Sequence, residues 1–463
     1  MKISFHGASQ GVTGSCHLLE CGNKKILIDC GMYQGEGELE IDNASSFGFN
    51  EKEIDYLLLT HAHLDHCGRI PLIAKRGFKG EVICTRATAE LARLIMMDAA
   101  YLQEEDTRYE IRKAQRRGKN TDEIEPLYNR LDAMNSLEFF GRKAEYNVPM
   151  QLAPGIQATF IDAGHILGSA SVLLELEDQG KRHRIIFSGD LGYSDRAILR
   201  DPTPPPQVDT VVMETTYGNR LHKALQPSID ELYSVINDTV KRGGNVIIPT
   251  FALERAQEVL FYLREGANAG KIDRRINIFL DSPMAISATR IFERHPECYD
   301  EKTLKLLQDG EDIFRPPGLR FTSETAESMA INRISGGAVI MAGSGMCTGG
   351  RVRHHLKHNL WRKDCSVIFV GFAARGTLAR RIIDGAKTVR VLGDEITVKA
   401  RIHTIGGFSA HADQAELLKW HTHAGKPAKT FLVHGEKDTM HEFARHLKHT
   451  RVEIPALHQS YKL

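Results

Sequence analysis

The chain has 463 residues, 42% of them hydrophobic, and this length suggests two or three domains. Lys and Arg total 60 against 59 for Asp and Glu, so the formal charge of +1 does not by itself indicate nucleic-acid binding. A basic surface that binds nucleic acid would have to be a local cluster of charges. The eight cysteines are scattered and form no CxxC pair, which excludes a disulfide scaffold and predicts a cytoplasmic protein. No apolar run approaches the roughly 20 residues of a membrane span, so we expect no membrane segment.

The first half of the chain alternates short β-like runs with loops, several of them bounded by Gly, Asp or Pro. Between these runs, Ala87 to about Arg117 carries strong helix formers and dense charge, which predicts one or two exposed helices. The four prolines of 201–206 predict a connector. The expected strands are 2–5, 17–20, 25–28, 55–60, 81–84, 157–161, 171–175 and 184–188.

After Gly218 the pattern changes to βα alternation, which predicts a parallel sheet covered by helices. The expected helices are 229–241, 254–264 and 351–361, and the expected strands are 245–249, 276–281, 338–342 and 366–371. Strands of the first kind return at 395–403 and 430–434. We therefore expect one domain, made of 1–216 and 384–463, to be interrupted by a separate α/β domain at 217–383.

The densest chemical signal is a cluster of four metal-competent side chains, directly after the apolar run 56–59: His61, His63, Asp65 and His66. In an extended segment residues i and i+2 point to the same side, so His61 and His63 can reach one ion. Asp65 and His66 follow where the chain turns toward a helix, and they would face a second point. The alternative is a chance grouping of surface histidines. Neutral imidazole suits zinc, copper, iron or nickel.

Three later strands end in the same kind of residue, namely His165, Asp190 and His434. A tetrahedral zinc needs only four ligands, so seven candidates predict two ions with Asp190 as the bridge. We assign His61, His63 and His165 to one ion, and Asp65, His66 and His434 to the other. Asp29, at the end of another strand, is expected either to orient a ligand histidine or to cap the turn before Gly31.

The order and spacing of these motifs resemble the metallo-β-lactamase superfamily, in which HxHxDH and later His, Asp and His residues bind two zinc ions between two β-sheets. Glu214 in 213–218, His411 in 408–413 and His434 in 432–436 resemble motifs A, B and C of its β-CASP branch. The resemblance implies an α/β fold, in which a metallo-β-lactamase αββα sandwich is interrupted by an inserted α/β β-CASP domain.

That branch processes nucleic acids, and histidine rather than valine at motif C favours RNA over DNA. The chain is most similar in this respect to the eukaryotic pre-mRNA 3′-end cleavage nuclease and to compact bacterial β-CASP ribonucleases. The resemblance implies hydrolysis of single-stranded RNA to 5′-phosphate and 3′-hydroxyl ends, internally or from the 5′ end, in RNA processing or degradation. A homodimer is left open.

For the chemistry we expect a water between two zinc ions as nucleophile, with Asp65 and Asp190 as catalytic carboxylates. His411 is the expected general acid, held and kept protonated by Glu214. The alternative for His411 is a buried structural histidine.

RNA contacts are expected in the inserted domain, where the glycine-rich run 343–350 precedes a helix that begins near Arg351. Charged residues on a helix are more often a solvated face, so these assignments compete with a simple strand-to-helix connection. The candidate RNA-binding residues are Thr250, Arg255, Ser344, Gly345, Arg351, Arg353 and Arg375.

Two other functions compete with a ribonuclease. A hydrolase of small esters or thioesters would keep the metal site, but it needs neither an inserted domain nor Glu214 and His411. A non-catalytic RNA-binding subunit would lose metal ligands, whereas this chain keeps all seven.

Overall fold

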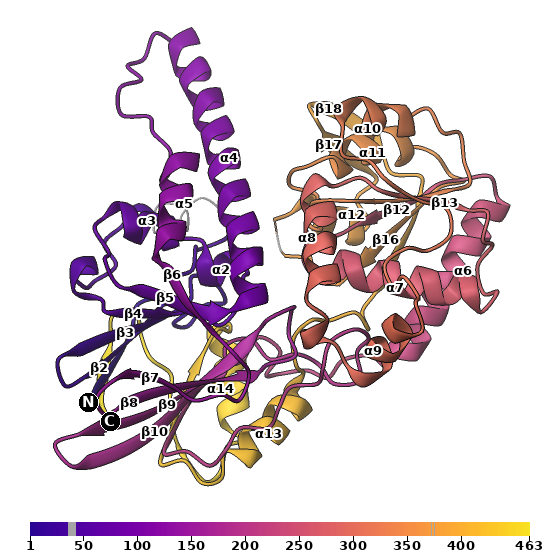
Figure 1. The fold of residues 1–463 in the computed structure, drawn as a ribbon. Helices are drawn as coiled ribbons and strands as arrows, with labels where there is room; N and C mark the ends of the chain where they lie inside the picture. The colour runs from indigo at the N-terminus through magenta and orange to yellow at the C-terminus, as the bar shows by residue number, and fades with distance from the viewer. Residues whose placement is uncertain (36–42, 372, 375) are drawn as a thin grey trace. The chain divides into compact units, whose positions relative to one another are not determined.

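The structure, a computed structural model, describes residues 1–35, 43–371, 373–374 and 376–463. The chain divides into two compact units, which Figure 1 traces from indigo to yellow. The first unit consists of 1–194, 201–221 and 411–463, and the inserted unit consists of 195–200 and 222–410. The expected α/β architecture, with one domain interrupted by another, is confirmed.

Two seven-stranded sheets form the first unit. In spatial order the first sheet contains β22 (Ser460–Lys462), β1 (Lys2–Phe5), β2 (His17–Cys21), β3 (Lys24–Ile28), β4 (Tyr56–Leu58), β5 (Glu81–Thr85) and β6 (Phe140–Ala144). The second contains β21 (Arg451–Glu453), β20 (Lys429–Val433), β11 (Thr210–Glu214), β10 (Lys181–Phe187), β9 (Ala170–Asp178), β8 (Ile156–Asp162) and β7 (Met150–Ala153).

The two sheets pack face to face, because alternate residues of their strands are apolar and fully buried between them. Phe5 of β1 and Phe431 of β20 meet across the sandwich with ring centroids 4.9 Å apart. Helices cover the outer faces, and Trp420 and Phe443 belong to the cluster that packs on β8–β11 and β20. The helices of this unit are η1 (Glu51–Glu53), α2 (Leu64–Cys67), α3 (Ile70–Lys75), α4 (Arg86–Arg116), α5 (Arg130–Ser136), η2 (Leu137–Phe139), α13 (Gln414–His423) and α14 (Lys437–Ala444).

The inserted unit is built on a six-stranded parallel sheet, whose strands read as near-continuous apolar runs because helices cover both faces. In spatial order the strands are β14 (Leu319–Phe321), β13 (Asn277–Leu280), β15 (Ala338–Ala342), β12 (Val246–Pro249), β16 (Ser366–Val370) and β19 (Arg401–Ile405). Its helices are α6 (Leu225–Lys241), α7 (Arg255–Asn268), α8 (Pro283–Arg294), η3 (Pro296–Cys298), α9 (Glu301–Gln308), α10 (Thr325–Ile331), α11 (Val352–Asn359) and α12 (Leu378–Ile383).

One expected strand differs in the structure. Instead of a single strand at 395–403 of the first domain, the chain forms a hairpin of β17 (Thr388–Val391) with β18 (Asp394–Thr397), followed by β19, which pairs in parallel with β16 of the inserted unit. The inserted unit accordingly extends to Ala410, beyond the boundary at 383 that we expected. A strand's own residues do not specify which sheet it joins, because both sheets offer the same backbone hydrogen bonds.

Candidate metal centre

The histidine cluster lies on the connection from β4 to α2, where extended backbone changes to helix as expected. His63 has φ −66° and ψ 150° and is the cap residue of α2, so Asp65 and His66 lie in the first turns of that helix. Two other residues at strand ends, Asp29 and His434, adopt φ of +60° and +50°. Residues other than glycine rarely adopt this left-handed backbone conformation. It persists only where the surrounding structure stabilises it, and such residues cluster at functional sites.

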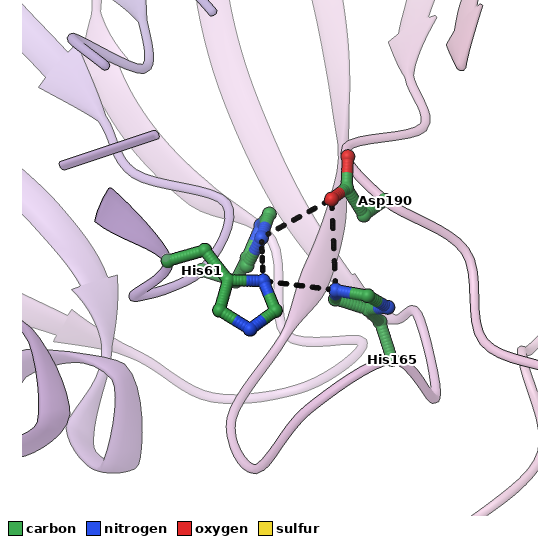
Figure 2. Close-up of side chains that lie close together, drawn as sticks. His61, His165 and Asp190 are labelled. Atoms are coloured by element: carbon green, nitrogen blue, oxygen red, sulfur yellow. Dashed lines mark hydrogen bonds and ion pairs between the residues drawn. The ribbon is translucent and has the colours of Figure 1, made fainter. Parts of the chain in front are cut away.

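Four of the predicted ligands form one group: His61, His63, His165 and Asp190. Nδ1 of His63 lies 3.1 Å from Nε2 of His61 and 3.1 Å from Nε2 of His165. Oδ2 of Asp190 lies 3.4 Å from Nε2 of His61 and 3.5 Å from Nε2 of His165, an arrangement that Figure 2 shows. Strands β8 and β10 therefore aim a histidine and a carboxylate at the pair from the β4 connection.

The other three predicted ligands form a second group: Asp65, His66 and His434. Nε2 of His434 lies 3.1 Å from Nε2 of His66 and 3.4 Å from Oδ2 of Asp65. The second oxygen of Asp190, Oδ1, is 3.3 Å from Nε2 of His66 and 3.6 Å from Nε2 of His434. The carboxylate of Asp190 thus presents one oxygen to each group.

The donor set fits bound metal. Oδ1 of Asp190 is buried and makes no hydrogen bond, although a buried oxygen normally has a partner. Burial lowers the pKa of His61 to about 3 and that of His63 to about 4, so both imidazoles are neutral and keep a lone pair for an ion. Around a tetrahedral zinc with bonds of about 2.0–2.1 Å, ligand nitrogens are about 3.3 Å apart, close to the spacing seen here.

Three further side chains contact the predicted ligand histidines on the side away from the donor groups. Oδ2 of Asp29 lies 2.7 Å from Nδ1 of His66 and also accepts the hydroxyl of Thr60 at 2.8 Å. The oxygen of that hydroxyl is 3.0 Å from Nδ1 of His61, and the hydroxyl oxygen of Thr216 is 3.1 Å from Nδ1 of His434. Thr60 and Thr216 were not predicted from the sequence, where the available signal was their position one residue before His61 and two residues after Glu214.

His411 lies beside both groups. Its Nδ1 is 3.2 Å from Oε1 of Glu214 and 3.9 Å from Oδ2 of Asp190. Glu214 is fully buried at the end of β11, where it accepts the backbone N–H of Leu191 at 2.6 Å. Burial alone would lower the pKa of His411. The charge and hydrogen bond of Glu214, with smaller contributions from the charges of Asp190 and Asp65, outweigh burial and raise the pKa to about 9. The pair therefore favours a protonated imidazole next to the donor groups.

The predicted RNA-binding residues differ in their burial and in their contacts. Thr250, Ser344 and Gly345 lie at the carboxyl ends of β12 and β15, an edge where ligands commonly bind in parallel sheets. Thr250, however, is buried, and its hydroxyl makes no hydrogen bond. Arg353 is half-buried, with one nitrogen 3.5 Å from the carbonyl of Thr348. Arg375 lies outside the described residues.

Two predicted RNA-binding arginines are engaged in ion pairs. The guanidinium of Arg255 is buried against Glu258. That of Arg351 binds Asp281 at 2.8 Å and the carbonyl oxygens of Thr322 and Ser323. These contacts occupy part of the hydrogen-bonding capacity of each guanidinium group.

Phe251, which the sequence analysis did not select, is a large aromatic side chain at the same sheet edge. It is 41% exposed, and its ring packs against the backbone of Gly345, where a Cβ would come within 2.7 Å of the ring.

Among the described residues, no helix combines the length and apolar character needed to cross a bilayer.

Three segments match known domain families. Residues 10–234 match the metallo-beta-lactamase superfamily, residues 256–382 match the Beta-Casp domain, and residues 395–457 match the Zn-dependent metallo-hydrolase RNA specificity domain. A protein of unknown function from Enterococcus faecalis V583 has a similar fold, with a TM-score of 0.58 over 100% of this chain and 99% of that chain at 12% identity.

Curated relatives match over almost the whole chain. Ribonuclease TTHA0252 of Thermus thermophilus is 39% identical over 440 residues, which cover 95% of this chain and 94% of that protein. The RNase J-like protein of Methanocaldococcus jannaschii is 30% identical, with 96% of this chain and 94% of that protein covered. Transcription termination factor FttA of the same organism is 31% identical and covers 96% of this chain, which spans 68% of that factor.

Proposed function

The chain belongs to the β-CASP family of the metallo-β-lactamase superfamily and is a metal-dependent ribonuclease, and from this premise we propose that it is a two-zinc enzyme that hydrolyses single-stranded RNA. The products we propose are 5′-phosphate and 3′-hydroxyl ends. The observation that carries the proposal is the position of Asp190, which presents one oxygen to each donor group and lies 3.9 Å from Nδ1 of His411.

We assign one zinc to His61, His63 and His165, the other to Asp65, His66 and His434, and the shared carboxylate to Asp190. The two groups of nearby donor atoms support this assignment. When bound, two such ions would acidify a water molecule and neutralise charge on a phosphate oxygen. The description of the C-terminal match as Zn-dependent supports the choice of metal.

The protein's own part of the reaction is proton transfer and positioning. Nδ1 of His411 is engaged with Glu214, so we assign Nε2 as the atom that gives a proton to the leaving 3′ oxygen. Hydrolysis adds water across the bond between phosphorus and that oxygen, so the hydroxyl stays on phosphorus and the proton from His411 appears on the 3′ oxygen. A proton released by the attacking water restores His411 for the next turnover.

The test compares the purified wild-type chain with His411→Ala. We expect two zinc ions per chain in both proteins, cleavage of single-stranded RNA by the wild type, and a rate about 10²–10⁴-fold lower in the variant. Lys181→Ala, which shortens an exposed side chain outside the RNA specificity segment, is the control and should retain full activity.

Three outcomes separate this function from its competitors. Metal with RNA cleavage supports the proposal, metal with hydrolysis of small esters alone supports a small-substrate enzyme, and RNA binding without metal supports a non-catalytic subunit. Mapping cleavage of RNAs with free and blocked 5′ ends distinguishes internal cutting from 5′ to 3′ digestion. Full activity of His411→Ala would overturn the role of that residue.

A further inference from the structure

The long helix α4 has two halves of different character. Its buried residues end at Ala100, and every side chain from Tyr101 to Arg116 is exposed or half-buried. At 1.5 Å per residue these last 16 or so positions extend about 24 Å beyond the core, and Figure 1 shows α4 continuing past α3 and α5. We call residues 101–120 the arm.

One acidic side chain near the start of the arm, Glu104, binds other residues of the first unit. Glu104 accepts the backbone N–H and Nε of Arg130 at 2.8 and 2.9 Å and lies 3.3 Å from Arg108. The segment after the arm returns to the core at Tyr128, which is completely buried. The chain is therefore anchored to the core both before and after the arm, and the arm is an ordered extension of this unit.

The charge of the arm is concentrated at its far end. Residues 107–120 contain six basic side chains and one acidic side chain, in a chain whose formal charge is only +1. Glu110 pairs with Lys113 at 3.2 Å. In the part of the chain that the structure describes, four basic residues of this segment have no ion pair: Arg112, Arg116, Arg117 and Lys119.

These side chains are not needed to finish the helix. The carbonyl of Ala114 accepts the backbone N–H of Arg117 at 2.9 Å, and that of Gln115 accepts the N–H of Gly118 at 3.0 Å. Basic residues in a last turn are favourable to the helix dipole, and this alone would explain two or three of them. It does not explain the aromatic side chain among them.

Tyr109 is 59% exposed, and Nζ of Lys113 lies 5.8 Å from its ring centroid. Together with Arg112, Arg116 and Arg117 these two residues line a hollow of about 200 Å³. An exposed ring offers a face on which a base can stack, and guanidinium groups around it offer phosphate contacts. A single strand of nucleic acid satisfies both features, since it presents unpaired bases and a charged backbone.

We propose that the end of the arm is a second RNA-binding surface, which holds a distant part of a long single-stranded substrate. The inference rests on the proposed function, which supplies that substrate. The start of α4 is fixed beside the metal centre, because Thr85 and Thr88 both donate to the carbonyl of Gly168 in the His165 loop, at 2.7 and 2.8 Å. A helix of 31 residues is about 45 Å long, so a short oligonucleotide at the metal centre does not reach the hollow.

The test reverses three charges together, as Arg112→Glu, Arg116→Glu and Arg117→Glu in one variant. We expect KM for a single-stranded RNA of about 40 nucleotides to rise at least about ten-fold with kcat unchanged, and KM for an oligonucleotide of about 6 nucleotides to stay the same. The slope of log affinity against log salt for the long RNA should fall by about 2, because each lost phosphate contact removes about 0.7.

The matched control reverses three exposed basic residues elsewhere in the first unit and outside the RNA specificity segment, as Lys52→Glu, Lys79→Glu and Lys181→Glu, and should leave both KM values unchanged. An unchanged KM and salt slope for long RNA in the arm variant overturns the inference, even if that variant loses affinity for an acidic protein. If the wild type cleaves neither RNA, the proposed function fails instead, so the two failures are distinguishable.

Discussion

Nδ1 of His411 lies 3.2 Å from Oε1 of Glu214, although 197 positions separate the two residues in the chain. Glu214 is fully buried, whereas the side chain of His411 is 20% exposed. A buried carboxylate stabilises the positive charge of the neighbouring imidazole, and the exposed side of the imidazole can donate a proton. This relationship, together with the position of Asp190 between the two groups, gives the first three predictions.

Replacement of Glu214 by Gln should lower the pKa of His411. In the metal-free protein the pKa of His411 is about 9, above its ordinary 6.5, because Glu214, with smaller contributions from Asp190 and Asp65, outweighs burial. Without that charge only Asp190 and Asp65 oppose burial, and we expect the pKa to fall by more than about one unit, as measured by NMR titration of the His411 ring. A pKa near 9 in the variant would contradict the assigned cause.

The same shift has a consequence for stability. A raised pKa in the folded state contributes stability that is fully present below pH 6.5 and is lost as the pH rises through about 9. The difference in Tm between metal-free wild type and Glu214→Gln should therefore shrink between about pH 6 and about pH 10. A difference that grows over this range would reverse the sign of the argument.

Replacement of Asp190 by Asn should disturb both metal-binding groups, because Oδ1 and Oδ2 of this residue face different groups. We expect Asp190→Asn to lower the zinc content of both groups, whereas His165→Ala should empty only one. Mass spectrometry of the native chain measures the number of bound ions directly. Zinc content equal to wild type in Asp190→Asn would contradict a shared carboxylate.

Chelation supplies an independent check on the same groups. A ligand that binds only the folded state stabilises it, so removal of zinc should lower the Tm of the wild type. The effect should be much smaller in Asp190→Asn, which has less metal to lose.

Replacement of Thr60 by Val should weaken metal binding while changing the shape of the side chain little. The Thr60 hydroxyl donates to Asp29 and lies 3.0 Å from Nδ1 of His61, so it orients two ligand systems at once. Loss of such outer contacts typically costs about 10–100-fold in metal affinity. Competition with a chromophoric chelator gives this affinity, and Thr60→Ser, which keeps the hydroxyl, should stay close to wild type.

Replacement of Arg196 by Met should destabilise the inserted unit. Arg196 is buried between Glu254 and Glu258, at 3.3 and 3.4 Å, and its loss leaves buried carboxylates without that counter-charge. Breaking a buried pair in this way costs about 3–5 kcal/mol. Hydrogen exchange across α7 in denaturant measures the loss within the unit.

The control for that prediction is Arg275→Met, because Arg275 is 89% exposed and pairs with Asp273 at the surface. An exposed pair contributes about 0–1 kcal/mol, so this variant should resemble wild type. The double variant Arg196→Met with Glu254→Gln should regain part of the stability, since it removes a buried carboxylate that has lost the charge of Arg196, whereas Glu258 keeps its ion pair with Arg255. Equal stability of Arg196→Met and wild type would show that the cluster is not maintained in solution.

The resemblance stated from the motifs is confirmed by the three domain matches and the curated relatives. The backbone at His61 to His66 followed the sequence because it depends on local geometry, an extended segment that turns into a helix. Thr60 and Thr216 escaped notice for the opposite reason. A hydroxyl becomes informative only when the fold brings it within hydrogen-bond distance of a ligand histidine.

By itself the sequence determined the residue types, their local spacing and the alternation of strands and helices, and these sufficed to predict the fold class. The seven metal donors stay a prediction, which the grouping of their side chains supports. Only the tertiary structure decided which distant partner each side chain has. Arg255 and Arg351 were predicted from the sequence to contact phosphate, and in the structure their guanidinium groups bind Glu258 and Asp281. β19 read as part of the first domain, yet it pairs with β16. Ion pairs and strand pairs form between residues far apart in the chain, and competition among many such partners is resolved only when the whole chain packs.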